Sequence, residues 1–199
     1  MGKKEKVKKP FYKKWWVWVI AVIIVFAIFG GGGDTTETKE EVKEEENAKT
    51  VDQEAFKAYA QNIMGRTFIN SISVTENKGL IEFFGSYDEF KQAKPESPLT
   101  EEEYKGYFET GDAIEKILVG ENVRLLRQFP DLVSTSMVLP YGGKTYSIDL
   151  DRKEVNDYLG FKVEELSVED KSWHEKFSNP ILYDEGKRKE FFDKFVEVK

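Results

Sequence analysis

Cysteine is absent from the 199-residue chain, and histidine occurs once, as His174. Without cysteine the protein has neither disulfides nor a lipidated cysteine anchor. A zinc site normally takes several His or Cys ligands, so a single histidine argues against one. The chain also lacks a phosphate-binding glycine motif, a nucleophile elbow and an S-x-x-K motif. We therefore expect no catalytic residues, no metal and no cofactor.

Basic residues are scarce relative to acidic ones after the first 14 residues. The chain has a net charge of -7. Residues 1–14 hold seven lysines and one glutamate, a net charge of +6, which leaves -13 for the rest. An acidic domain repels nucleic acid, and no basic stripe with interleaved aromatic residues occurs in it. The sequence thus predicts no nucleic acid partner.

One long uncharged apolar run is present, WWVWVIAVIIVFAIF at residues 15–29. Extended to residue 33, it reaches close to the ~30 Å thickness of a bilayer core at about 1.5 Å of helical rise per residue. The residues expected at the membrane interface are Lys13, Lys14, Trp15, Trp16 and Trp18. Lysines precede the run and mostly acidic residues follow it, which predicts a single-pass protein of the cell membrane with residues 1–14 in the cytoplasm.

Two other interpretations of the apolar run remain open. A cleaved secretory signal peptide has a similar basic start, but Phe29 directly before four glycines makes a poor cleavage site. A core helix of a soluble protein fits the tryptophans and the lysine collar poorly. A membrane span is the interpretation we prefer.

The segment KKPFYKKWWVWVIAVII, at residues 8–24, resembles the anchor of many small surface proteins of Gram-positive bacteria of the Firmicutes type. The resemblance covers about a tenth of the chain. Such anchors carry unrelated outer domains, so the resemblance implies a cell-envelope location and no particular activity. The outer domain itself resembles no family that we can name.

The remainder divides into a polar linker and one domain. Residues 34–50, DTTETKEEVKEEENAKT, hold almost no apolar side chains and are predicted to form an acidic flexible stalk. Residues 51–199 show regular apolar spacing and are long enough for one domain with its own core.

The apolar periodicity and the turn residues of residues 51–199 predict an α+β domain. We expect about four strands in a largely antiparallel sheet, with helices packed on it. A turn at residues 76–79 and another at residues 142–143 should close two hairpins, and residues 85–98 should form a loop. The expected helices follow the caps Asp52, Thr100, Asp151, Ser167 and Asp184. The helical pattern from Thr100 to about residue 128 is either one helix or two with a break near Gly111.

Four residues of this domain are candidates for contacting a ligand or partner. Asp149 and Asp151 lie two apart at a strand exit, which places their side chains on one side about 7 Å apart, close enough for a shared cation or an acid–base pair. The preferred alternative is that Asp149 points outward and Asp151 caps a helix. Trp173 is more typical of a core anchor than of a ligand platform. His174 is more typical of a surface histidine than of a general base.

Taken together, these features predict a non-enzymatic binding or accessory module of the cell envelope, with the lipid bilayer and an envelope protein as partners. One alternative is a bitopic component of a secretion or conjugation machine. A third hypothesis is an envelope hydrolase or small-ligand binder that uses Asp149, Asp151 or His174. The sequence predicts no oligomeric state.

Overall fold

The computed structural model describes residues 50–199. The predicted membrane span at residues 15–33 and the interface residues Lys13, Lys14, Trp15, Trp16 and Trp18 lie outside the described residues, as does nearly all of the predicted stalk. Among residues 50–199, no helix combines the length and the apolar character that crossing a membrane requires.

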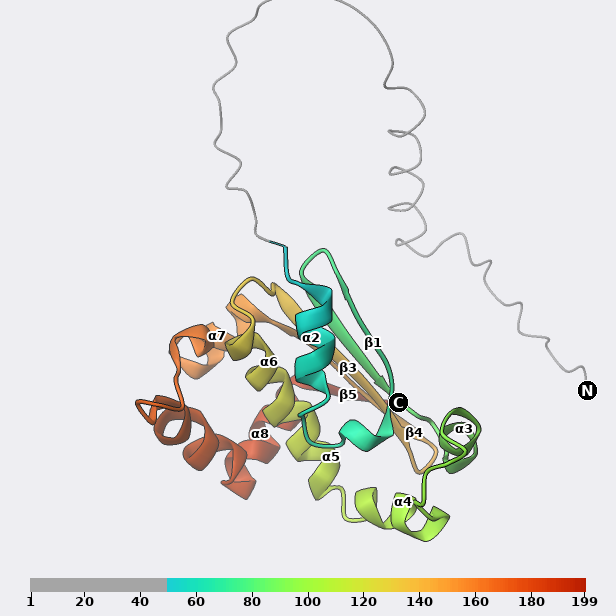
Figure 1. Cartoon of the computed structure of the whole chain (residues 1–199). Helices are drawn as coiled ribbons and strands as arrows, with labels where there is room; N and C mark the ends of the chain where they lie inside the picture. The colour runs from blue at the N-terminus through green and yellow to red at the C-terminus, as the bar shows by residue number, and fades with distance from the viewer. Residues whose placement is uncertain (1–49) are drawn as a thin grey trace, which may run out of the picture. The chain divides into compact units, whose positions relative to one another are not determined.

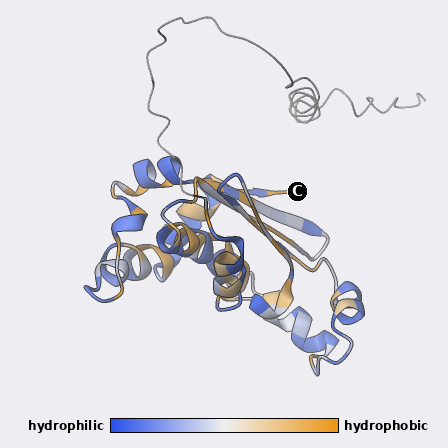
Figure 2. Cartoon of the chain, turned by 45° about the horizontal axis from the view of Figure 1, so that its top comes forward, coloured by the Kyte–Doolittle hydropathy of each residue, from blue (hydrophilic) through white to orange (hydrophobic). Residues whose placement is uncertain are grey.

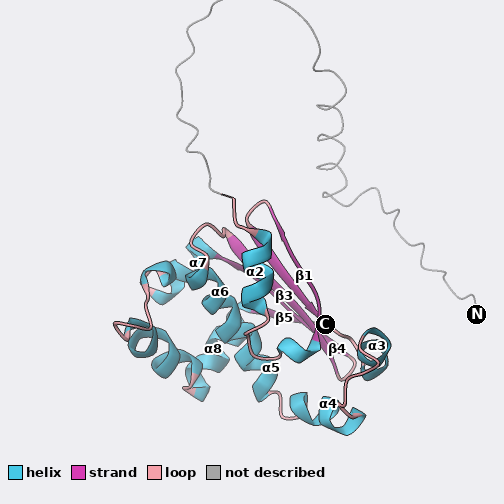
Figure 3. Ribbon diagram, in the orientation of Figure 1, coloured by secondary structure: helices cyan, strands magenta, loops and turns pink. Residues whose placement is uncertain are grey.

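The described residues form a mixed α+β domain, as the sequence predicts (Figure 3). The α-helices are α2 (Gln53–Ala60), α3 (Tyr87–Ala93), α4 (Glu101–Phe108), α5 (Asp112–Lys116), α6 (Asn122–Gln128), α7 (Arg152–Leu159) and α8 (Glu185–Phe195). The strands are β1 (Ile69–Thr75), β2 (Lys78–Phe83), β3 (Ser134–Tyr141), β4 (Lys144–Asp151) and β5 (Val196–Val198). Two π-helical segments, Ile117–Glu121 and His174–Leu182, and two short 3-10 turns complete it.

The five strands form one sheet in the order β1-β2-β3-β4-β5. The pairs β1–β2, β3–β4 and β4–β5 are antiparallel, and β2–β3 is parallel. The prediction of a largely antiparallel sheet is therefore confirmed. The fifth strand was not predicted, because the alternation of Val-Glu-Val covers only three residues directly after a helix, too few to indicate a strand.

The helices gather on one face of the sheet (Figures 1 and 2). The inward side chains of the strands, among them Ile81, Met137 and Leu150, are fully or almost fully buried against them. The side chains of the opposite face stay half-buried or exposed along most of its length. Because no element of residues 50–199 covers that face, it differs from the inner face in composition and exposure.

The first hairpin turns at Glu76 and Asn77, which have φ values of 52° and 57°. Gly79 was predicted to contribute to this turn, and that prediction is wrong. Gly79 lies in β2, where an added Cβ would come within 2.6 Å of the Phe56 ring. The glycine therefore lets α2 approach the sheet closely. The second hairpin turns at Gly142 and Gly143 as predicted, both with positive φ.

Residues 85–98 do not form a simple loop, because they contain α3. Ser86 caps this helix by accepting from the Glu89 backbone N–H at 3.2 Å. The prolines Pro95 and Pro98 and the polar composition hid the helix in the sequence. Farther on, Thr100 and Glu103 form the predicted capping box, and Gly111, with a φ of 78°, separates α4 from α5. The two-helix alternative is thus the one that the structure shows.

The two π-helical segments pack against each other. Pro180 lies inside the second one and has no N–H to donate, which favours a shifted hydrogen-bond pattern. Asn122, which begins α6 directly after the first segment, is fully buried, and its Nδ2 donates to the Leu118 carbonyl at 2.7 Å. An added Cβ on Gly120 would come within 2.9 Å of the Leu182 side chain. A glycine is therefore needed where these segments touch.

Candidate functional site

In the structure Asp149 and Asp151 each accept a hydrogen bond from a neighbouring group of the fold. Asp149 is exposed on the outer face of the sheet and accepts from the Ser136 hydroxyl of the neighbouring strand at 2.8 Å. Asp151 caps α7 by accepting from the Glu154 backbone N–H at 3.0 Å. Each carboxylate thus has a local structural partner. Among residues 50–199 no three acidic or histidine side chains are grouped closely enough to hold a metal ion.

Trp173 belongs to the hydrophobic core. It is 8% exposed and its ring centroid lies 4.8 Å from that of Phe177. The Arg127 guanidinium lies over the indole, 4.8 Å from the ring centroid. Its neighbour His174 begins the second π segment and is exposed. The buried indole offers no stacking surface to a ligand, and neither Asp149 nor Asp151 shares a hydrogen bond with the histidine.

A groove of about 480 Å³ lies beside α7, with Leu132 and Val133 at its base and Asp151 and Arg152 in its wall. The polar groups of that wall are already bonded. Arg152 donates to the carbonyls of Leu126, Phe129 and Leu132, at 2.8, 2.8 and 2.7 Å, and to the Glu164 carboxylate at 2.9 Å. Each nitrogen of its guanidinium is thus engaged within the fold, and the group closes the C-terminal end of α6.

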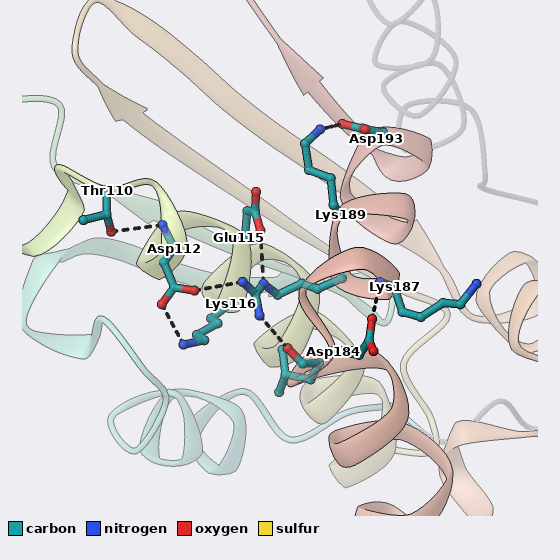
Figure 4. A network of polar contacts seen from close by, with 10 residues as sticks. Thr110, Asp112, Glu115, Lys116, Asp184, Lys187, Lys189 and Asp193 are labelled. Carbon is teal, nitrogen blue, oxygen red and sulfur yellow. Dashed lines mark hydrogen bonds and ion pairs between the residues drawn. The ribbon is translucent and has the colours of Figure 1, made fainter.

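A buried cation, Arg188, joins α8 to α5. It donates to Asp112 at 2.8 Å, to Glu115 at 3.1 Å and to the Leu182 carbonyl at 2.9 Å. Figure 4 shows Asp112 and Glu115 reaching from α5 into this network, and Asp112 also accepts from Lys116. All the charges of the network are paired, which is typical of a structural ion cluster.

A different arrangement lies at the border of the sheet that β1 forms. A hollow of about 370 Å³ opens between the end of α2, the first half of β1 and the end of α3. Its lining residues are Lys57, Gln61, Arg66, Ile69, Asn70, Ser71, Ile72 and Lys94. Three of these are cationic and none is acidic, although residues 50–199 hold 29 acidic and 20 basic side chains. We call this hollow the β1-edge groove.

The three cations of the β1-edge groove differ in how they are held. Lys94 donates to the carbonyls of Thr67 at 2.8 Å and Ile69 at 3.5 Å, so it covers the start of the strand edge. Burial lowers the pKa of the Lys94 ammonium. Lys57 pairs with Glu54 at 3.2 Å on the surface of α2. Arg66 is exposed and makes no ion pair with another residue of the described chain.

Sequence reasoning did not nominate the residues of the β1-edge groove. The pattern predicted β1 as a strand, but it gave no sign that this strand would lie at the border of the sheet. Lys57, Arg66 and Lys94 come from three separate segments and show no motif. Strand order, which depends on the packing of the whole domain, decides that they meet.

No protein-family model, no curated protein and no solved structure matches this chain. Its function has to be argued from its own residues.

Proposed function

We propose that this chain is a single-pass membrane protein whose domain, residues 51–199, is a non-enzymatic binding module outside the cytoplasm. The apolar run at residues 15–33 and the lysines before it support the anchor and its orientation. The acidic composition of residues 34–50 supports a tether that gives the domain reach. The partner is a protein of the cell envelope.

The observation that carries the proposal is the face of the sheet that no helix of residues 50–199 covers, together with the border strand β1. This outer face presents mainly hydroxyl and aliphatic side chains, which are half-buried, together with the carboxylates of Glu82 and Asp149, which accept from Ser71 and Ser136. The uncharged side chains are those of Ser71, Ser73, Leu80, Ser136, Val138, Thr145 and Ser147. The border strand β1 is seven residues long and, among residues 50–199, pairs with β2 alone. Open sheet faces and unpaired strand edges are surfaces on which other proteins dock.

The described polar groups support binding rather than catalysis. Asp151, Arg152 and Arg188 are each engaged in capping or ion pairs within the fold. A general base needs a nearby substrate proton to take and a nucleophile to activate, and these groups face backbone and partner charges instead. Their hydrogen bonds hold helices in place.

The proposal is tested by crosslinking in intact cells. A C-terminally tagged chain is treated with a crosslinker that does not pass the membrane, and captured proteins are identified by mass spectrometry. The matched control is a tagged chain that ends at residue 50 and keeps the anchor and tether. We expect one envelope protein to be captured by the full chain and not by the control. If protease added outside the cells cleaves the domain but the crosslinked chain captures no protein, the proposal is contradicted.

A further inference from the structure

The two borders of the sheet are not equivalent. At one border β5 has three residues and also pairs through Lys199, whose backbone exchanges two hydrogen bonds with Thr145. At the other border β1 has seven residues and no neighbour beyond it among residues 50–199. About half of the backbone N–H and C=O groups of such a strand point away from the sheet. The long border is therefore the one able to accept a further strand.

The chemistry of the β1-edge groove selects the kind of strand. Its lining holds Lys57, Arg66 and Lys94 and no carboxylate, within a domain that is otherwise acidic. Arg66 has no charged partner in the described chain, so an incoming carboxylate would displace nothing from it. Charge complementarity thus favours an acidic segment over a basic or neutral one.

Lysines at a sheet border also prevent unwanted pairing between sheets. Lys94 fits that role at the start of β1, because its ammonium already donates to the carbonyls of Thr67 and Ile69. The remainder of the strand, residues 70–75, has no such cover from Lys94. The protecting lysine therefore marks where an added strand would have to stop.

We propose that residues 70–75 of β1 bind an extended acidic segment of a partner protein by strand addition, with carboxylates of that segment over Arg66 and Lys57. This inference rests on the proposed function, since it names the surface and the partner chemistry of the same binding module. Backbone hydrogen bonds supply the pairing, and the cations select acidic sequences. The binding weakens as salt concentration rises.

The test measures fluorescence anisotropy of a labelled short peptide that alternates valine or threonine with glutamate, added to the full chain in detergent micelles. One control peptide replaces each glutamate by lysine, and a second carries N-methyl groups on alternate backbone nitrogens. We expect saturable binding of the acidic peptide alone. Equal binding of the lysine or the N-methylated peptide would overturn strand addition by an acidic segment, as would no binding of the acidic peptide.

Matched variants locate the site. Arg66→Glu should weaken binding by at least about fivefold, the effect of reversing one exposed charge at a contact. Lys153→Glu makes the same charge change on α7, where the lysine is 85% exposed, and should leave the dissociation constant within about twofold. Equal weakening by both variants would show that only net charge matters and would contradict the proposal.

Other occupants of the edge give different results. A second copy of the chain would produce a concentration-dependent dimer that Arg66→Glu abolishes. Peptide binding that appears only after residues 34–49 are deleted would show that this acidic segment fills the edge itself. Either result contradicts an outside partner. The peptide experiment probes the β1 edge alone. A peptide that does not bind would contradict strand addition, but it would leave the crosslinking test of the binding module unaffected. A partner that crosslinks to the domain away from β1 would support the binding module and contradict docking on β1.

Discussion

At the scale of single residues, Arg188 is the one charged residue among residues 50–199 whose side chain is buried. It holds α8 against α5 through Asp112 and Glu115 and reaches back to the Leu182 carbonyl. Removing the guanidinium would leave two carboxylates facing each other and a carbonyl without its donor. Both effects destabilise the folded state.

We predict that Arg188→Met lowers the free energy of unfolding by about 2 kcal/mol, because the carboxylate partners are partly exposed and regain some hydration. Urea denaturation of residues 50–199, which contain the whole core, measures the change. The control, Lys189→Met on the same helix, removes a 54% exposed lysine and should change the stability by less than about 0.5 kcal/mol. Equal stability of Arg188→Met and the parent would show that the ion cluster is dispensable.

Glu121 gives a residue-scale prediction on pH. Burial raises the pKa of its carboxyl group, although Arg124 and the Met64 N–H, at 3.3 and 3.2 Å, act in the opposite direction. The folded state therefore holds this proton more tightly than the unfolded state. Between the ordinary pKa of 4.5 and the raised value, stability should fall as pH rises through this group.

The variant Glu121→Gln removes the titration and keeps an acceptor for the Met64 N–H. We expect its stability, measured by urea denaturation at a series of pH values, to decline less than that of the parent over that window. As a control, Glu190→Gln changes a 60% exposed carboxylate, and its stability should depend on pH as that of the parent does. A steeper decline in Glu121→Gln than in the parent would mean that the Arg124 pair outweighs burial.

At the scale of elements, the contact between the two π-helical segments depends on Gly120. Its missing side chain lets Leu182 come so close that an added methyl group would lie 2.9 Å from two carbons of the leucine. A distance below 3.0 Å requires the neighbour to move, so the terminal methyl groups of the half-buried Leu182 side chain would have to shift. The glycine therefore permits the close packing of the two π-helical segments.

We predict that Gly120→Ala destabilises the domain by about 2 kcal/mol through overpacking. The control is Gly106→Ala in α4, where nothing lies within 4 Å of the added methyl group. That substitution should stabilise the domain by about 0.5 kcal/mol, since alanine is the better helix former. Thermal unfolding of both variants shows whether each one stabilises or destabilises the domain. A Gly120→Ala variant that is more stable than the parent would contradict the close contact.

At the scale of the whole molecule, the absence of cysteine allows a direct test of topology. Single cysteines are introduced as Glu5→Cys before the apolar run and as Lys153→Cys in the domain, where the native side chain is 85% exposed. A maleimide that cannot cross membranes is then added to intact cells. We expect Lys153→Cys to be labelled at once and Glu5→Cys only after the cells are opened, because the proposed orientation places the lysine-rich N-terminus inside.

The reverse labelling pattern would place the domain in the cytoplasm and contradict the proposed orientation. Labelling of both cysteines in intact cells would contradict a membrane span at residues 15–33. The cysteine-free parent is the control for background.

The sequence alone determined the features that depend on neighbouring residues. The caps Asp52, Thr100, Asp151 and Asp184 start helices as predicted, and both hairpins form near the predicted turns, because these signals act through hydrogen bonds and backbone angles within a few residues. The prediction that Gly79 belongs to the turn was wrong, because packing against Phe56 outweighed the local turn signal. Helix α3 was missed, because capping by Ser86 outweighed the nearby prolines.

Only the tertiary structure decided which segments meet. It paired β2 with β3 across the helical region from α3 to α6 and added β5 to the far border. At the other border it placed β1, which has no further strand beside it among residues 50–199, near Arg66 and Lys94. It also assigned Arg152 and Arg188 to carbonyls and carboxylates many residues away. These contacts depend on how the apolar faces of all the elements are buried together, and no short stretch of sequence carries that information.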